Sequence, residues 1–329
     1  MQATMQNLSQ VKLSEHLATS NQLIARSFSY SEDGKQLFFL QGTANLIQAS
    51  AELDHFKSIP LAETTLGDLL VNPTGEVMFT NQRQSPTITA WAIPTGKVIN
   101  EFKGLQGRTY APQLSNDYLV ASSLGQHILI WQASSGELLY DLLHQDLVFG
   151  YQLNHSGSQL ISWGLKGALA WQLSDGQSQA RPLPNNGPRI SQVLFSSDDQ
   201  NLFCLSQIDD PVMPALQNKV YLERWHAFGL QLQQRFLVAS DSGFPHRLHL
   251  WQDSVVLIND RQSLRAMQTS DGQVLGQWQS TVDQLDYYYL AIHPTTGQLI
   301  HADADQLILY RQQLLLKLEA TFIPTILSS

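Results

Sequence analysis

The chain has 329 residues, of which 43% are hydrophobic and 14% charged, and its formal net charge is −9. This hydrophobic content is enough for a large buried core and excludes a disordered chain. The negative charge argues against sequence-independent nucleic-acid binding and against docking on anionic lipid, because both need a basic surface.

In chain order, the sequence is a series of short β-type runs separated by tight-turn signals. Five runs lie next to turns that are rich in Asn, Asp, Pro and Gly; they cover residues 37–40, 77–80, 118–121, 159–162 and 202–205. Four further runs end just before a tryptophan and cover residues 88–90, 128–130, 168–170 and 221–224. Each turn favours glycine because one of its residues needs a positive φ. Residues 196–199 occupy the same turn position without a glycine.

The runs belong to an internal repeat of about 40 residues. Trp91, Trp131 and Trp171 are spaced by 40 residues, and each is followed by a glycine five positions later. Four short strands in about 40 residues are typical of one blade of a β-propeller. A tryptophan at a fixed place in each unit is expected to fill the gap between neighbouring blades.

We therefore predict an all-β fold, a seven-bladed β-propeller of four-stranded antiparallel blades, built from a single domain over residues 1–329. The predicted blades cover residues 22–60, 61–104, 105–144, 145–184, 185–240, 241–281 and 282–319. A run at 11–17 is expected to form an extra strand, and a run at 314–318 the outer strand of the last blade. One of the two is expected to complete the ring, since this would remove an exposed edge.

The repeat resembles the WD-repeat β-propeller family over almost the whole chain. The fourth unit carries the resemblance best: His144 stands in the histidine position of that family, and Trp171 precedes Asp175 and Gly176. The aspartate that normally follows the tryptophan is replaced, for example by Ala92 and Gln132. We therefore expect the buried Asp–His–Ser–Trp network of that family to be missing or broken in each blade. The resemblance implies a protein-interaction role.

No catalytic, cofactor-binding or metal-binding motif is found in the sequence. It lacks a glycine-rich phosphate loop and a nucleophile elbow. The single cysteine, Cys204, lies in a β-type run, so we expect a small buried hydrophobic side chain. The closest approach to a metal site is His301, Asp303 and Asp305, which would share one strand face, but a solvated turn is the favoured interpretation. We expect no cofactor and no metal.

The most irregular segment is an insertion in the fifth unit, at residues 206–219. It should leave from the face that also carries the blade-to-blade connections. Stiff, apolar loops suit protein recognition. Several connections on that face carry arginine or phenylalanine, a combination suited to an acidic peptide. The predicted partner-binding residues are Arg108, Arg181, Arg189, Pro211, Met213, Leu216, Phe244 and Arg247.

The sequence thus predicts a non-catalytic protein-interaction scaffold that holds an unidentified protein partner on one face and is monomeric by itself. One alternative is a hydrolase or lactonase with its site in the axial funnel. Another is an extracytoplasmic binding or sensor propeller. No secretory signal is found in the first residues and no run of about 18 apolar residues occurs, so we expect a cytoplasmic protein that binds neither membrane nor nucleic acid. The composition, with 37 glutamines, is more typical of a bacterial protein.

Overall fold

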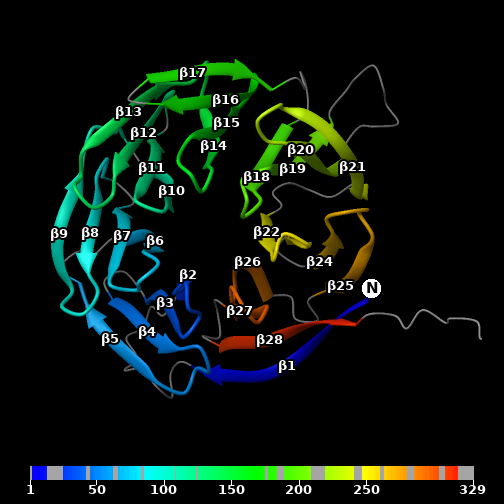
Figure 1. Ribbon diagram of the computed structural model, residues 1–329. Coiled ribbons are helices and arrows are strands. Elements are labelled where there is room, and N and C mark those ends of the chain that lie inside the picture. Colours follow the sequence, from blue (N-terminus) through cyan, green and yellow to red (C-terminus); the bar gives the residue numbers. More distant parts are fainter. Residues whose placement is uncertain are drawn as a thin grey trace, which may run out of the picture.

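The computed structural model describes residues 2–12, 25–41, 45–61, 66–82, 85–107, 109–123, 125–174, 177–183, 189–208, 219–240, 247–259, 263–279, 285–303 and 308–317. In these ranges the chain forms seven four-stranded antiparallel sheets, set around a central axis as a β-propeller (Figure 1). The described part of the chain holds no helix with the length and hydropathy needed to cross a membrane.

Six of the sheets are complete blades, each made of four consecutive strands. Blade 1 consists of β2 (Ala25–Tyr30), β3 (Gln36–Gln41), β4 (Asn45–Ser50) and β5 (Phe56–Pro60). Blade 2 consists of β6 (Leu66–Val71), β7 (Val77–Gln82), β8 (Ile88–Ala92) and β9 (Lys97–Phe102). Blade 3 consists of β10 (Thr109–Ser115), β11 (Tyr118–Ser123), β12 (His127–Gln132) and β13 (Leu138–Leu143). Blade 4 consists of β14 (Val148–Leu153), β15 (Gln159–Gly164), β16 (Gly167–Ser174) and β17 (Gln177–Pro182). Blade 5 consists of β18 (Arg189–Phe195), β19 (Asn201–Ile208), β20 (Lys219–His226) and β21 (Gln231–Ser240). Blade 6 consists of β22 (Arg247–Trp251), β23 (Val255–Asn259), β24 (Ser263–Gln268) and β25 (Val274–Gln279). The nine β-type runs predicted from the sequence all lie in these strands.

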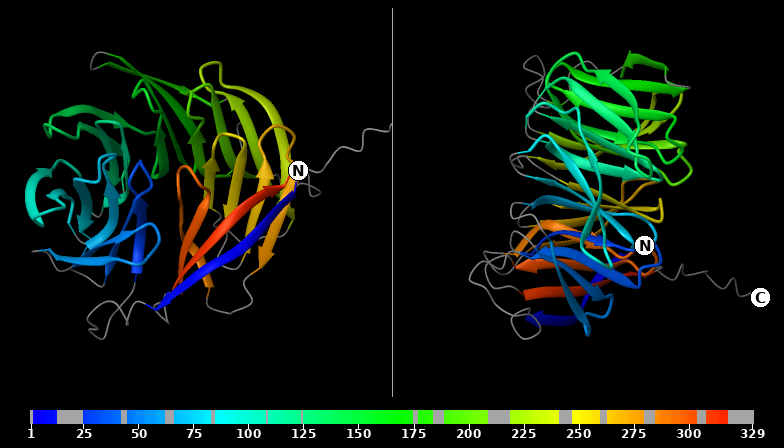
Figure 2. Two further views of the ribbon diagram at one scale, coloured as in Figure 1. Left: turned by 60° about the horizontal axis from the view of Figure 1, so that its bottom comes forward. Right: turned by 90° about the vertical axis from the view of Figure 1, so that its left-hand side faces the viewer.

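The structure corrects the expected count of seven blades. Only six of the seven predicted units form a complete four-stranded blade from their own residues. The last unit supplies only three strands, which are β26 (Leu285–Ile292), β27 (Gln298–Asp303) and β28 (Ile308–Lys317). The fourth strand of this closing sheet is β1 (Gln2–Lys12), which pairs antiparallel with β28 (Figure 2). Residues 314–318 were therefore wrongly expected to form an outer strand, and the N-terminal strand begins earlier than the expected 11–17. Pairing both chain ends covers the edge that β28 would otherwise expose.

The order of strands in a blade defines two faces of the ring. The first strand of each blade lies nearest the axis and the fourth lies outside (Figure 1). Because neighbouring strands are antiparallel, the first-to-second and third-to-fourth turns share one face, here called the bottom face. The second-to-third turns and the connections between blades share the opposite, top face.

The hydrophobic core lies between neighbouring blades. Trp91 packs with Phe38 and Leu40 of blade 1, and Trp225 packs with Ile161 and other residues of blade 4. Trp131 and Trp171 fill the equivalent gaps and are also buried. This confirms the role predicted for the repeat tryptophans, each of which contributes a few kcal/mol of buried apolar surface.

Local sequence explains the turns on the bottom face. In the turn that begins at Asn154, the side-chain oxygen of Asn154 accepts a hydrogen bond from the Gln159 backbone N–H at 2.9 Å, and Gly157 has a φ of 73°. Asp199 holds the corresponding position of blade 5 with a φ of 58°. Aspartate tolerates this left-handed conformation better than most residues, so the turn forms without a glycine.

Candidate functional site

Five of the eight predicted partner-binding residues lie outside the residues that the structure describes. Arg108, Pro211, Met213, Leu216 and Phe244 fall outside the described residues. Arg189 begins β18 and Arg247, which is partly buried, begins β22; both therefore start inner strands at the top face. The strand ends Ile208 and Lys219 pair with each other, so the insertion leaves from the top of blade 5.

Arg181 is exposed in β17, yet its guanidinium has a defined structural partner. It donates a hydrogen bond to the backbone carbonyl of Phe228, in the turn between β20 and β21. The side chain therefore links the outer strand of blade 4 to blade 5. A substitution of Arg181 is expected to change the contact between the two blades as well as any binding surface.

The residues that sequence reasoning missed are four exposed apolar side chains at the top face, on the end of β13, the connection between blades 3 and 4, the start of β14 and the β15–β16 turn. The top-face cluster consists of Leu143, Leu147, Phe149 and Leu165, whose exposed fractions are 59%, 45%, 57% and 65%. Leu165 lies at the tip of the β15–β16 turn. An exposed leucine in a two-residue turn between glycines was a sequence signal, because turns normally carry polar residues.

A buried polar contact holds this cluster in place. The Asp146 carboxylate lies 2.9 Å from Nδ1 of His144, and it accepts a hydrogen bond from the Lys166 backbone N–H at 2.6 Å. The side chain of His144 is fully buried and that of Asp146 is 10% exposed. Asp146 therefore fastens the turn that carries Leu165 to the connection that carries Leu147.

Close packing at Gly164 supports the same arrangement. A Cβ atom at this position would lie 2.2 Å from a carboxylate oxygen of Asp146 and 2.4 Å from the backbone carbonyl of Leu147. Only glycine allows the turn and the connection to approach this closely. Gly164 thus lets the turn that carries Leu165 pack directly on the connection that carries Leu147.

The Asp–His–Ser–Trp network was expected to be missing or broken, and two blades keep only its bond from the tryptophan to a hydroxyl group. Trp171 donates from Nε1 to the Ser162 hydroxyl at 2.8 Å, and Trp91 donates to the Thr80 hydroxyl at the same distance. In blade 4 the buried His144 is present as well. Nε2 of His144 has no hydrogen-bond partner in the described part of the chain.

Cys204 explains why blade 5 departs from this pattern. It stands on β19 where Ser162 and Thr80 stand in their blades, and it is fully buried, as predicted. Burial, reinforced by the negative charge of Glu223, raises the pKa of its thiol well above the usual value. Trp225 donates instead to the buried Glu223 carboxylate at 3.1 Å, and Arg235 pairs with the same carboxylate at 2.7 Å.

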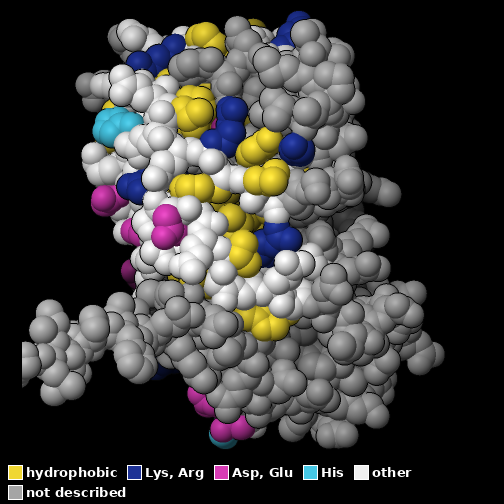
Figure 3. Space-filling model, turned by 90° about the vertical axis from the view of Figure 1, so that its right-hand side faces the viewer, with side chains coloured by type: hydrophobic (Ala, Val, Ile, Leu, Met, Phe, Trp, Pro, Cys, Tyr) yellow, Lys and Arg dark blue, Asp and Glu magenta, His cyan; other side chains and the backbone are white. Residues whose placement is uncertain are grey.

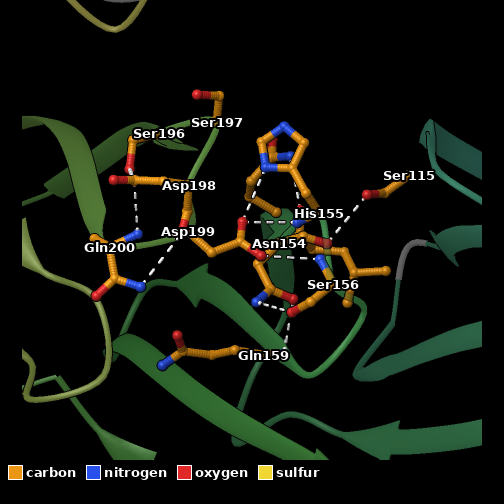
Figure 4. Close-up of polar contacts among 12 residues, drawn as sticks. Ser115, Asn154, His155, Ser156, Gln159, Ser196, Ser197, Asp198, Asp199 and Gln200 are labelled. Atoms are coloured by element: carbon orange, nitrogen blue, oxygen red, sulfur yellow. Dashed lines mark hydrogen bonds and ion pairs between the residues drawn. The ribbon is translucent and has the colours of Figure 1, made fainter.

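The bottom face contains a His–Asp pair that invites comparison with a catalytic dyad. Nδ1 of His155 lies 2.9 Å from the Asp199 carboxylate, which also accepts the backbone N–H groups of His155 and Ser156 (Figure 4). Burial opposes the charge of Asp199, but these hydrogen bonds outweigh it and hold the pKa of the carboxyl below its usual value. The Ser156 hydroxyl is engaged with that of Ser158 at 2.8 Å.

The same arrangement recurs in the next blade, which indicates a structural role. The Ser197 backbone N–H donates to the Asp253 carboxylate at 3.0 Å, so blade 6 holds a turn of blade 5 in the way that blade 5 holds a turn of blade 4. Gln252 of blade 6 in turn donates to the Thr295 carbonyl of the closing sheet. These bonds join neighbouring blades along the bottom face.

A second group of exposed apolar side chains follows the outer strands of blades 5 and 6. It includes Leu232 and Leu237 of β21 and Val274 of β25, which are 42%, 51% and 48% exposed. The view onto this side shows hydrophobic side chains interspersed with lysine and arginine (Figure 3). The mixture is ordinary for a protein surface, where single apolar residues are common.

No group of three or more His, Cys, Asp or Glu side chains in the described ranges is arranged to hold a metal ion. Asp305 lies outside the described ranges, and the backbone of His301 and Asp303 lies in β27. No protein-family model and no curated protein matches this chain. The structure shows the β-propeller fold, and membership of the WD-repeat family stays a prediction.

Proposed function

We propose that this propeller is a non-catalytic scaffold that binds a partner protein on its top face, through the top-face cluster. The observation that carries the proposal is that Leu143, Leu147, Phe149 and Leu165 are all exposed on segments that reach the top face beside the buried Asp146. An apolar patch with a polar surround, held on a rigid base, is typical of an interaction site.

The size of the cluster fits this role. Its exposed fractions together equal a little more than two fully exposed side chains. Burying them would contribute roughly 3–7 kcal/mol before the costs of association, at about 1.5–3 kcal/mol for each complete side chain. This is enough for a central contact of an interface whose rim is polar.

The surroundings of the cluster suit a protein partner. Gln126 and Gln145 are exposed, and the Gln145 side chain donates to the Lys166 backbone carbonyl at 3.3 Å. The exposed Lys166 provides a positive charge next to Leu165. A partner with an apolar pocket and an acidic rim would therefore complement this part of the top face. The insertion of blade 5 leaves from the same face and provides a second region for the same partner.

The proposal is tested by capturing partners from the source cell with the purified protein and with Leu165→Asp, followed by mass spectrometry. Val98→Asp is the matched control, because Val98 is 48% exposed on β9, away from the cluster. We expect Leu165→Asp to lose a partner that the parent and Val98→Asp both retain, with equal melting temperatures for all three. Equal capture by the parent and Leu165→Asp would contradict the proposal.

A further inference from the structure

The outer strand of blade 3, β13, has an edge that lacks the usual protection against strand pairing. Natural edge strands are commonly shielded by lysine, arginine, proline or other charged residues. Lys57 and Pro60 lie in β5, Lys97 and Glu101 in β9, Arg181 and Pro182 in β17, Arg235 in β21, and Lys12 in β1. By contrast, β13 reads Leu-Leu-Tyr-Asp-Leu-Leu, with Asp141 as its one charge.

The only other outer strand without such residues is β25, and one feature sets it apart: it carries Gly276 in its middle, which weakens pairing. Both strands lie near the outer strand of a neighbouring sheet, β25 near β1 and β13 near β17. Among the described outer strands, β13 is therefore the best acceptor for an additional strand.

The pairing of β13 with β12 shows which side chains such a strand would meet. Three residues of β13 lie opposite alternate residues of β12: Leu138 pairs with Trp131, Asp141 with Leu129, and Leu143 with His127. A register shift between Ile130 and Trp131 brings Leu138 onto the same sheet face as the other two. This face therefore presents leucine, aspartate and leucine in succession. Leu138 and Leu143 are 48% and 59% exposed. The Asp141 side chain is 51% exposed, and one of its carboxylate oxygens lies 2.6 Å from Nδ1 of His127 on β12.

A second copy of this chain is a poor occupant of the edge. Two antiparallel copies of β13 related by a two-fold axis would place Leu138 opposite Leu143 of the other copy. In that register Asp141 would lie opposite itself, and like charges directly across two strands destabilise the pair. Charge complementarity instead calls for a basic residue opposite Asp141.

We propose that β13 accepts an extended segment of a partner protein as a fifth strand of blade 3. The segment would carry a lysine or arginine opposite Asp141, with an apolar residue two positions away on each side. Backbone hydrogen bonds to the open edge would supply affinity, and the side chains would set the register. Leu143 belongs to both surfaces, but Leu138 and Asp141 lie outside the top-face cluster, so this inference does not rest on the top-face proposal.

The test uses two capped, fluorescein-labelled heptapeptides and measures binding to the full chain by fluorescence anisotropy. The first has the sequence Thr-Leu-Thr-Arg-Thr-Leu-Thr, and the second replaces arginine with glutamate. We expect the arginine peptide to bind about fivefold more tightly than the glutamate peptide, the ratio that corresponds to about 1 kcal/mol for one cross-strand charge pair. The variant Asp141→Lys should reverse this preference.

Matched lysine substitutions locate the bound peptide on the surface. Leu138→Lys should weaken binding of both peptides, whereas Val98→Lys on β9 should leave both unchanged, since the parent residues are equally exposed, at 48% each. Asp141→Asn, which keeps the shape of the side chain, should abolish the preference if Asp141→Lys fails to fold.

Three results would overturn the proposal. One is the absence of binding of both peptides at millimolar protein. Another is a preference that Asp141→Lys and Asp141→Asn leave intact. The third is self-association of the parent chain that Leu138→Lys abolishes, which would assign the edge to a second copy.

Discussion

The buried Asp146 offers a sharp test of how the top face is held together. Replacing it with alanine removes the acceptor of the 2.6 Å bond from the Lys166 backbone. A hydrogen bond to a charged group contributes about 1.5–3 kcal/mol, and its loss leaves the Lys166 N–H without that acceptor. We therefore expect Asp146→Ala to lower the free energy of unfolding by about 1.5–3 kcal/mol.

The measurement is urea denaturation followed by tryptophan fluorescence, with the slope of the transition compared between variants. Asp117→Ala is a suitable control, because Asp117 also accepts several hydrogen bonds, including one from the Ser134 backbone at 2.8 Å, but at an exposed site. This control should lose only about 1 kcal/mol. A loss for Asp146→Ala no larger than that of the control would refute the reasoning.

Three further predictions concern other parts of the ring. Thr80→Val leaves the buried Nε1–H of Trp91 without its 2.8 Å acceptor, so the free energy of unfolding should fall by about 1–3 kcal/mol in the same urea assay. Burial, with a smaller effect of the Arg247 charge, lowers the pKa of His249 to about 4 against an opposing hydrogen bond to Asn259. As the pH falls, the imidazole of His249 is therefore protonated in the unfolded chain before it is protonated in the folded protein. The free energy of unfolding should decline as the pH falls from about 6.5 towards 4, by at most about 3 kcal/mol, and His249→Phe should remove this pH dependence. Deletion of residues 1–12 should expose the edge of β28 and produce a lower melting temperature with aggregation, measured by calorimetry and light scattering; an unchanged, monomeric protein would contradict the closing role of β1.

The functional site was less predictable than the fold, for reasons that particular residues illustrate. Leu165 could have been noticed, because a leucine between turn glycines is unusual. The pairing of His144 with Asp146 could not be recognised as an anchor, since the Lys166 backbone completes it from a distant turn. Arg181 was predicted as a binding residue from its place in the chain, but it also reaches the Phe228 carbonyl of the next blade.

The sequence by itself determined the blades, because their turns and strands depend on short-range chemistry. Asn154 and Gly157 shape one turn within four residues of chain, and Trp91, Trp131 and Trp171, spaced by 40 residues, fill the gaps between blades 1 and 4. Only the tertiary structure decided how the ring closes and which surface remains open. The pairing of Gln2 with Lys317 joins residues at opposite ends of the chain, and the exposure of Leu143 depends on which strands lie around it. Local periodicity contains no information about either, since both arise from contacts between segments that are far apart in the sequence.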